Sequence, residues 1–151
     1  MIDFPTLLNW LFQTAVAFVS TIAFAIIFHT PRRECLFCGI TGGVGWLVYL
    51  ICMYANLGVV ASSFFATVAL AWFSRIFAFC RKTPVTVFLI TGIFPLVPGV
   101  ALTTSIRDFF HSDYLSGAIR MLDALLVGGC IAMGVGVVVK LLSLLTGGAL
   151  L

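Results

Sequence analysis

Two prolines and a glycine interrupt an apolar stretch that otherwise has the composition of a membrane-spanning helix. The segment GIFPLVPGVAL, residues 92–102, contains Pro95, Pro98 and Gly99. Proline has no backbone N–H and its ring clashes with the preceding turn, so each proline frees a carbonyl group of the helix. Bare backbone at membrane depth is tolerated only where it faces protein or a water-filled cavity. The pattern predicts a helix broken inside the membrane; the alternative is a simple proline kink.

A broken helix could bind an anion because its second half would begin inside the membrane. Pro98 fits the first position of a new helix, and the N–H groups of Gly99, Val100 and Ala101 follow it without helical partners. Such a helix N-terminus carries partial positive charge and suits a carboxylate. The break is therefore a candidate site for the carboxylate of a small substrate.

Three further polar side chains extend this hypothesis. Thr91 lies before the break, Thr103 lies after it, and Arg75 lies on the preceding span, one turn beyond the small residue Ala71. An arginine inside a membrane is costly and usually functional, which suggests a counter-charge for the substrate. The alternative is that Arg75 extends to the nearby head groups. The candidate substrate-binding set is Arg75, Thr91, Pro95, Pro98, Gly99, Val100 and Thr103.

Ionisable residues near the last span offer a second, weaker candidate site. Asp123 follows Arg120 by three residues, a spacing that suits an ion pair within one helix. Such a pair at the membrane interface is one interpretation. Ion or proton coupling through Asp123 and Arg120 is the other, because His111 and Asp113 are expected on the same side of the membrane.

The sequence contains no convincing metal, cofactor or catalytic site. Cys35 and Cys38 form an isolated CLFC motif, and five cysteines cannot all pair within one chain. His29 and His111 are too few and too scattered to make a ligand set. Phosphate-binding loops, nucleophile elbows and paired carboxylates do not occur. We therefore expect no cofactor, no metal and no enzymatic activity.

The composition places these residues in a polytopic membrane protein. Hydrophobic residues make up 62% of the 151 residues and charged residues 9%, whereas a soluble domain carries roughly a quarter charged residues. The net charge of +3 is too small and dispersed for nucleic-acid binding. The first apolar run lacks a basic leader and is too long for a signal peptide, so we expect it to be retained. The sequence predicts an all-α bundle, a single membrane domain over residues 1–151, with about five spans at residues 7–28, 36–54, 59–79, 85–105 and 117–145.

The basic residues predict the orientation of these spans. Arg32 and Arg33 lie between the first and second spans, and Arg81 and Lys82 between the third and fourth. Because basic loops stay in the cytoplasm, the N-terminus is expected outside and the C-terminus inside. Lys140, near the end of the last span, agrees with this orientation.

Small and polar residues recur at helical spacing and predict close helix contacts. The expected packing faces are Gly39 with Gly43, Ser63 with Thr67 and Ala71, and Gly128 with Ala132 and Gly136. These faces exceed what five helices need, so we expect a homo-oligomer or a hetero-complex. On the first span, Asn9, Gln13 and Ser20 are expected to form interhelical hydrogen bonds; substrate contact is the alternative.

The PLVPG motif, an arginine-bearing span just before it and an early PRR loop together resemble the threonine/serine exporter family. The resemblance is to its small, all-membrane component of five spans and covers essentially the whole chain. It implies a multi-pass protein of the bacterial inner membrane and a companion membrane subunit that carries a soluble region. The implied substrates are threonine and serine, or dicarboxylates such as succinate, with Arg75, Pro95, Pro98 and Gly99 at the site. A non-transporting scaffold subunit and a pore remain alternatives.

Overall fold

The computed structural model describes residues 4–145 and is helical over nearly all of them. Four of the helices are long and apolar enough to cross a membrane, and the bent pair α4 and α5 makes a fifth crossing if the two form one span. The prediction of an all-α polytopic helix bundle is confirmed, and the helix is broken between α4 and α5, where Pro95 and Pro98 lie. The elements are α1 (Phe4–Ile27), α2 (Arg32–Tyr54), α3 (Gly58–Arg81), α4 (Val85–Ile93), the 3-10 turn η1 (Phe94–Leu96), α5 (Gly99–Phe110) and α6 (Tyr114–Leu145).

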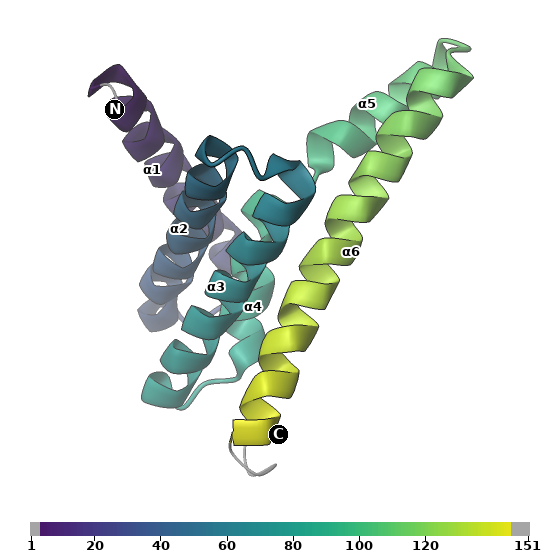
Figure 1. Cartoon of the computed structure of the whole chain (residues 1–151). Coiled ribbons are helices and arrows are strands. Elements are labelled where there is room, and N and C mark those ends of the chain that lie inside the picture. The colour runs from purple at the N-terminus through teal and green to yellow at the C-terminus, as the bar shows by residue number, and fades with distance from the viewer. Residues whose placement is uncertain (1–3, 146–151) are drawn as a thin grey trace.

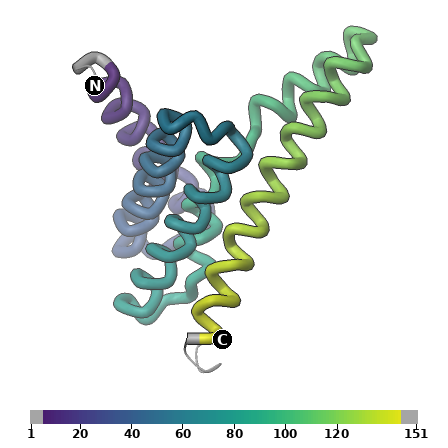
Figure 2. The backbone as a smooth tube through the Cα atoms, in the orientation of Figure 1, coloured from purple at the N-terminus to yellow at the C-terminus, as the bar shows by residue number. Residues whose placement is uncertain are grey.

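The helices pack in a chain, with the two halves of the broken span on different neighbours. Helix α1 packs on α2, α2 on α3 and α3 on α6, while α4 lies against α2 and α3. Helix α5 instead turns away and lies along the upper part of α6 (Figures 1 and 2). With 32 residues, α6 is about 48 Å long, and the apolar core of a bilayer is only about 30 Å thick. The α5–α6 hairpin therefore projects beyond the loop between α2 and α3.

Tight turns with left-handed residues reverse the chain after α1 and after α3. His29 (φ 55°) and Lys82 (φ 54°) adopt the left-handed conformation. The next residue in each turn donates its N–H back into the helix, from Thr30 to the Ala25 carbonyl and from Thr83 to the Ala78 carbonyl. This bonding satisfies the last carbonyl groups of the helix, and a proline follows in each turn before the next helix begins. These turns hold α1 antiparallel to α2 and α3 antiparallel to α4.

The connection between the last two spans is more helical than expected. Only residues 111–113 lie outside helices, because α5 continues to Phe110 and α6 begins at Tyr114. The buried Ser105 hydroxyl donates to the Gly117 carbonyl at 2.6 Å and holds the two helices together. A Cβ at Gly117 would approach the Ser105 carbonyl at 3.2 Å, so the close contact depends on this glycine.

The predicted ion pair between Arg120 and Asp123 is wrong. The Arg120 Nε lies 3.0 Å from Oδ2 of Asp108, on the facing helix α5. Asp108 is mostly shielded, whereas Asp123 is exposed on α6. The hairpin places the carboxylate of Asp108 opposite Arg120, and this long-range neighbour replaces the one three residues away in sequence.

Glycines on α2 allow α1 to approach closely. A Cβ added at Gly39 would meet the side chains of Phe18 and Ile22, both at 2.8 Å. One added at Gly42 would meet the Cβ of Thr21, also at 2.8 Å. Lipid offers no hydrophobic drive between helices, so this close packing supplies much of the attraction between α1 and α2.

The small-residue faces of α3 and α6 differ in what they contact. Ser63, Thr67 and Ala71 are buried, and a Cβ added at Gly134 of α6 would meet Thr67 at 3.1 Å. The face made by Gly128, Ala132 and Gly136 is exposed, and a Cβ at either glycine would meet nothing within 4 Å. The α6 face predicted to pack is thus on the outside of this chain.

An ion pair joins α2 to α3 at the end where Arg32 and Arg33 lie. The Arg81 guanidinium donates from Nε and from a terminal nitrogen to the Glu34 carboxylate, at distances between 2.8 and 3.2 Å. Glu34 is buried, whereas Arg81 is partly exposed and its guanidinium carbon lies 4.8 Å from the centre of the Phe37 ring. Glu34 is the only glutamate in the sequence, and this pairing satisfies its buried charge.

We predict that Gly42→Ala destabilises the bundle while Gly136→Ala does not. The new methyl at position 42 would overlap Thr21, and overpacking costs about 1–3 kcal/mol. At position 136 the methyl meets open space, so better helix propensity should add up to about 1 kcal/mol. Unfolding in mixed micelles measures both changes. Equal stability of the two variants would contradict the packing of α1 on α2.

We predict that the two halves of the Glu34–Arg81 pair respond unequally to mutation. Arg81→Gln leaves a buried carboxylate without its cation, whereas Glu34→Gln leaves Arg81 able to reach water and the Phe37 ring. The melting temperature should therefore fall more in Arg81→Gln, and the double variant should recover part of that loss. A larger fall in melting temperature in Glu34→Gln would contradict the view that the pair mainly compensates the buried charge of Glu34.

Candidate functional site

The break between α4 and α5 is a bend of 51° built from three local backbone features. The chain tightens into the 3-10 turn η1, and Val97 then becomes extended (φ −64°, ψ 129°), as residues before proline prefer. Pro98 has φ −76° and ψ 59°, close to an inverse γ-turn, and the Gly99 N–H donates to the Val97 carbonyl at 2.7 Å. Pro98 has no N–H to donate to the Phe94 carbonyl, and the Val97 N–H donates to this carbonyl in its place. The break is thus a turn in which the carbonyl freed by Pro98 is paired again.

The new N-terminus offers fewer donors than the sequence suggested. Pro98 is the N-cap residue, so α5 begins at Gly99, one residue later than expected. The Gly99 N–H is engaged in the turn. The helical bonds of α5 begin with the Leu102 N–H, which donates to the Pro98 carbonyl. The N–H groups of Val100 and Ala101 precede that bond, so the helix itself does not use them. A Cβ at Gly99 would meet nothing within 4 Å, and the approach to this end of α5 is open.

A cavity of about 290 Å³ lies beside the break. Its walls are Pro95, Trp46 of α2 and one face of α1, formed by Phe12, Gln13, Val16, Ala17 and Ser20. The lining is mostly apolar with a few neutral polar groups, as is common in small-molecule sites. The Trp46 indole nitrogen is buried without a hydrogen-bond partner in the described structure. Because α5 bends toward α6, it does not cover this side of α1 and α2.

The polar face of α1 bonds within its own helix. The Gln13 amide donates to Asn9 at 3.3 Å, and the Ser20 hydroxyl donates to the Ala17 carbonyl at 2.9 Å. The expected hydrogen bonds to other helices are not the ones these groups make. Gln13 and Ser20 instead contribute to the cavity wall.

The predicted threonines lie on either side of the break in different surroundings. Thr91 is 1% exposed and donates to the Val87 carbonyl at 2.7 Å, so its hydroxyl stabilises α4 from within. Thr103 is exposed on α5, and its hydroxyl lies 3.1 Å from the Gly99 carbonyl and 3.0 Å from that of Val100. Of the two, only Thr103 is open to a bound molecule.

Arg75 is not brought to the break. It lies on α3, near the end that carries Arg81, and lines two hollows there. One of them also contains Lys82 and Thr83, and the other is bounded by Leu142 of α6. Pro95 lines neither, so the predicted site residues divide into two groups. Arg120 and Asp123 belong to neither group, since both lie toward the other end of α6.

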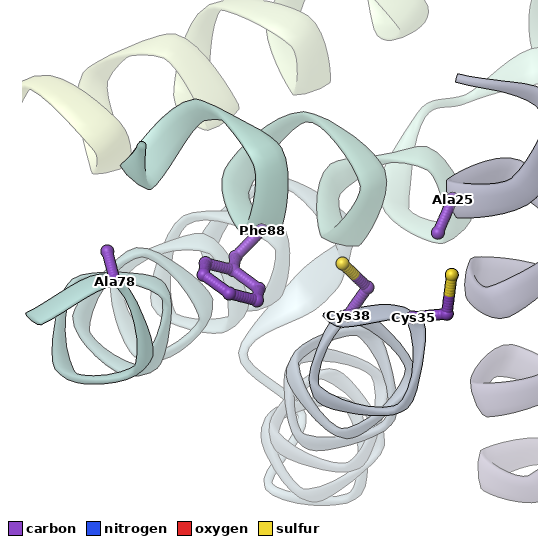
Figure 3. Close-up of a cluster of buried hydrophobic side chains, with 5 residues drawn as sticks. All are labelled: Ala25, Cys35, Cys38, Ala78 and Phe88. Atoms are coloured by element: carbon purple, nitrogen blue, oxygen red, sulfur yellow. The ribbon is translucent and has the colours of Figure 1, made fainter. Parts of the chain in front are cut away.

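Cys35 and Cys38 are buried in an apolar cluster with Ala25, Ala78 and Phe88 (Figure 3). The Cys35 thiol lies 3.7 Å from the Thr30 carbonyl, and the Cys38 thiol 3.9 Å from the Val87 carbonyl. Neither forms a disulfide, and residues 4–145 contain no group of three metal-ligating side chains. The CLFC motif serves packing between α1, α2, α3 and α4.

Two features of the site were absent from the sequence-based prediction. Trp46 was not singled out, although a tryptophan within a span is a recognisable signal because its indole N–H needs a partner. Lys82 entered that prediction only as a basic loop residue, and Thr83 did not enter it. Their place beside Arg75 depends on the left-handed turn at Lys82, which local composition does not reveal.

Comparison with known proteins gives a consistent family assignment. The family described as "Threonine/Serine exporter, ThrE" matches residues 13–141. A probable threonine/serine exporter of Mycobacterium tuberculosis is 26% identical over 123 residues, which is 81% of this chain and 23% of that protein. An uncharacterized protein of Haemophilus influenzae is 23% identical over 94 residues, 62% of this chain and 32% of that protein.

The chain thus spans about a third or less of the curated relatives it matches. No solved structure matches it. The matched region includes α2, α3, both halves of the broken span and nearly all of α6. This multi-pass membrane chain, with its bend of 51° between α4 and α5, belongs to the threonine/serine exporter family.

Proposed function

We propose that the chain is a membrane component of an exporter for small amino acids such as threonine and serine, or for related small carboxylates. Family membership points to transport rather than catalysis. The observation that carries the proposal is the break at Pro95 and Pro98, where α5 begins close to a cavity that Pro95 lines. Transporters commonly bind substrate at such discontinuous helices near the middle of the membrane.

In this proposal the substrate carboxylate is held at the start of α5. The N–H groups of Val100 and Ala101 and the partial positive charge of the helix end attract it. Gly99 has no side chain and nothing close to its Cβ direction, so a ligand can approach the backbone. The cavity between Gln13, Trp46 and Pro95 would receive the uncharged part of the substrate. Arg75 lines different hollows, so it is not among the residues proposed to hold the carboxylate.

The proposal includes a partner for this chain. The regions that the two relatives share with it make up 32% and 23% of those proteins. The exposed glycine face of α6 and the projecting α5–α6 hairpin are the surfaces best suited to another membrane subunit. We infer a companion membrane subunit, a second copy of this chain, or both.

We predict that Pro98→Ala and Gly99→Leu each lower substrate affinity by roughly ten- to a hundredfold. Pro98→Ala lets the helix run on and consume the donors of α5, while Gly99→Leu blocks approach to the backbone. Loss of one charge-assisted hydrogen bond costs about 1.5–3 kcal/mol, which corresponds to that range. Binding and export of threonine, serine and succinate would be measured with the companion subunit, at matched membrane abundance.

Ala55→Leu provides the control, because it adds a leucine side chain at an exposed position outside the cavity and away from the α6 glycine face. It should leave affinity unchanged. Wild-type affinity in both Pro98→Ala and Gly99→Leu would show that the break is a kink and not a binding site. If export is unaltered in every variant and the companion subunit also exports substrate without this chain, a scaffold role for this chain would be favoured.

We predict that the α2–α3 loop faces outward and the start of α2 faces the cytoplasm. Ala55→Cys and Arg33→Cys, each in a cysteine-free background, place a thiol at exposed positions on the two sides. A membrane-impermeant thiol reagent should label position 55 in intact cells and position 33 only after permeabilisation. The reverse pattern would invert the orientation, and labelling of both from one side would contradict a spanning α2.

A further inference from the structure

A hollow of about 580 Å³ lies where α3 ends and α4 begins, apart from the break. One side is formed by Arg75 and Phe79 of α3 and by its C-cap residue, Lys82. The other side is formed by Thr83, Pro84 and Val85. A second hollow of about 240 Å³ shares Arg75 and Phe79 and continues toward α6, where Leu142 lines it. The two hollows thus adjoin at Arg75 and Phe79, and we call them together the groove.

The first part of the groove attracts anions. Two cations, Arg75 and Lys82, line it together with the start of α4. In that first turn the Val87 N–H donates to the Pro84 carbonyl, so the N–H groups of Val85 and Thr86 precede the helical bonds and carry the positive end of α4. Because a guanidinium has five N–H donors, Arg75 can serve an additional partner.

The acidic residue described at this end of the bundle already has another partner. Among the described residues near this end of the bundle, Glu34 is the acidic one, and its carboxylate is taken up by Arg81. The hydroxyl oxygen of Thr83 is buried in the wall without a hydrogen-bond partner. The hollow thus combines two cations, a helix N-terminus and an unsatisfied hydroxyl.

The second part of the groove is apolar. Besides Arg75, its lining is Trp72, Ile76, Phe79, Cys80 and Leu142, on α3 and α6. Phe79 is 74% exposed and separates the polar hollow from this apolar one. A free carboxylate or phosphate would occupy only the first part, whereas an amphiphile with an anionic head and an acyl chain would fill both.

We propose that this groove binds an anionic phospholipid. Its phosphate would lie between Arg75, Lys82 and the start of α4, and its acyl chain would run along Phe79 toward α6. The lipid would join the ends of α3, α4 and α6, which only partly cover one another here. The site is separate from the break, so it stands or falls independently of the transport proposal.

Lys82→Gly is the most informative variant. Lys82 has φ 54°, a conformation that glycine adopts without strain, so removing this charge should preserve or improve the fold. Arg75→Gln removes the second cation. Arg33→Gln is the matched control, because it removes one charge from an exposed position at the same end of the bundle, outside the groove.

The test measures binding of phosphatidylglycerol and phosphatidylcholine with identical chains to the purified full chain, by native mass spectrometry. Wild type should prefer phosphatidylglycerol. Lys82→Gly and Arg75→Gln should each weaken its binding about fivefold, while Arg33→Gln leaves it unchanged. Thermal unfolding of each variant, with and without lipid, shows whether the protein is folded.

Three results would overturn the proposal. Absence of a preference for phosphatidylglycerol would exclude an anion site. Equal losses of lipid binding in all three variants would show that general surface charge causes the preference. Full displacement of the lipid by inorganic phosphate or by threonine at equal concentration would assign the hollow to a free anion. Retention of lipid binding in folded Lys82→Gly and Arg75→Gln would place the lipid elsewhere.

Discussion

Backbone hydrogen bonding in an apolar medium is the constraint on which this structure depends. Every N–H and carbonyl at membrane depth needs a partner within the protein, and two prolines in one span deny that to a continuous helix. The chain responds with the turn η1 and the γ-turn at Pro98, which re-pair the Phe94 carbonyl and the Gly99 N–H. The result is a bend of 51° and a second helix that begins after the break.

The bend determines where the other helices can lie. Helix α4 stays with α2 and α3, but α5 points away and needs a partner of its own. The length of α6 supplies this partner, because it reaches past α3 to meet α5. Ser105 and Gly117 then fix the hairpin through one buried hydrogen bond. The side of α1 and α2 that a straight span would cover is left with a cavity beside Pro95.

Charge is distributed to match this architecture. The buried carboxylate of Glu34 is held by Arg81, and Asp108 is held by Arg120. Each of these contacts joins two helices. Arg75 and Lys82 instead line a hollow beside the start of α4, where positive charge accumulates. Arg81 and Arg120 thus join helices, and Arg75 and Lys82 add positive charge to one hollow.

The sequence alone determined the class of the protein, its helices and the position of the break. These follow from local properties: an apolar run long enough to cross a bilayer, and prolines that deny a hydrogen bond to their own helix. Tertiary structure decided which partners distant residues found. Arg120 met Asp108 rather than Asp123, Arg75 lay beside Lys82 rather than at Pro98, and the Gly128–Gly136 face turned outward. The reason is that the direction of α5 after the bend, and with it the rotation of α6, depends on contacts between segments far apart in sequence.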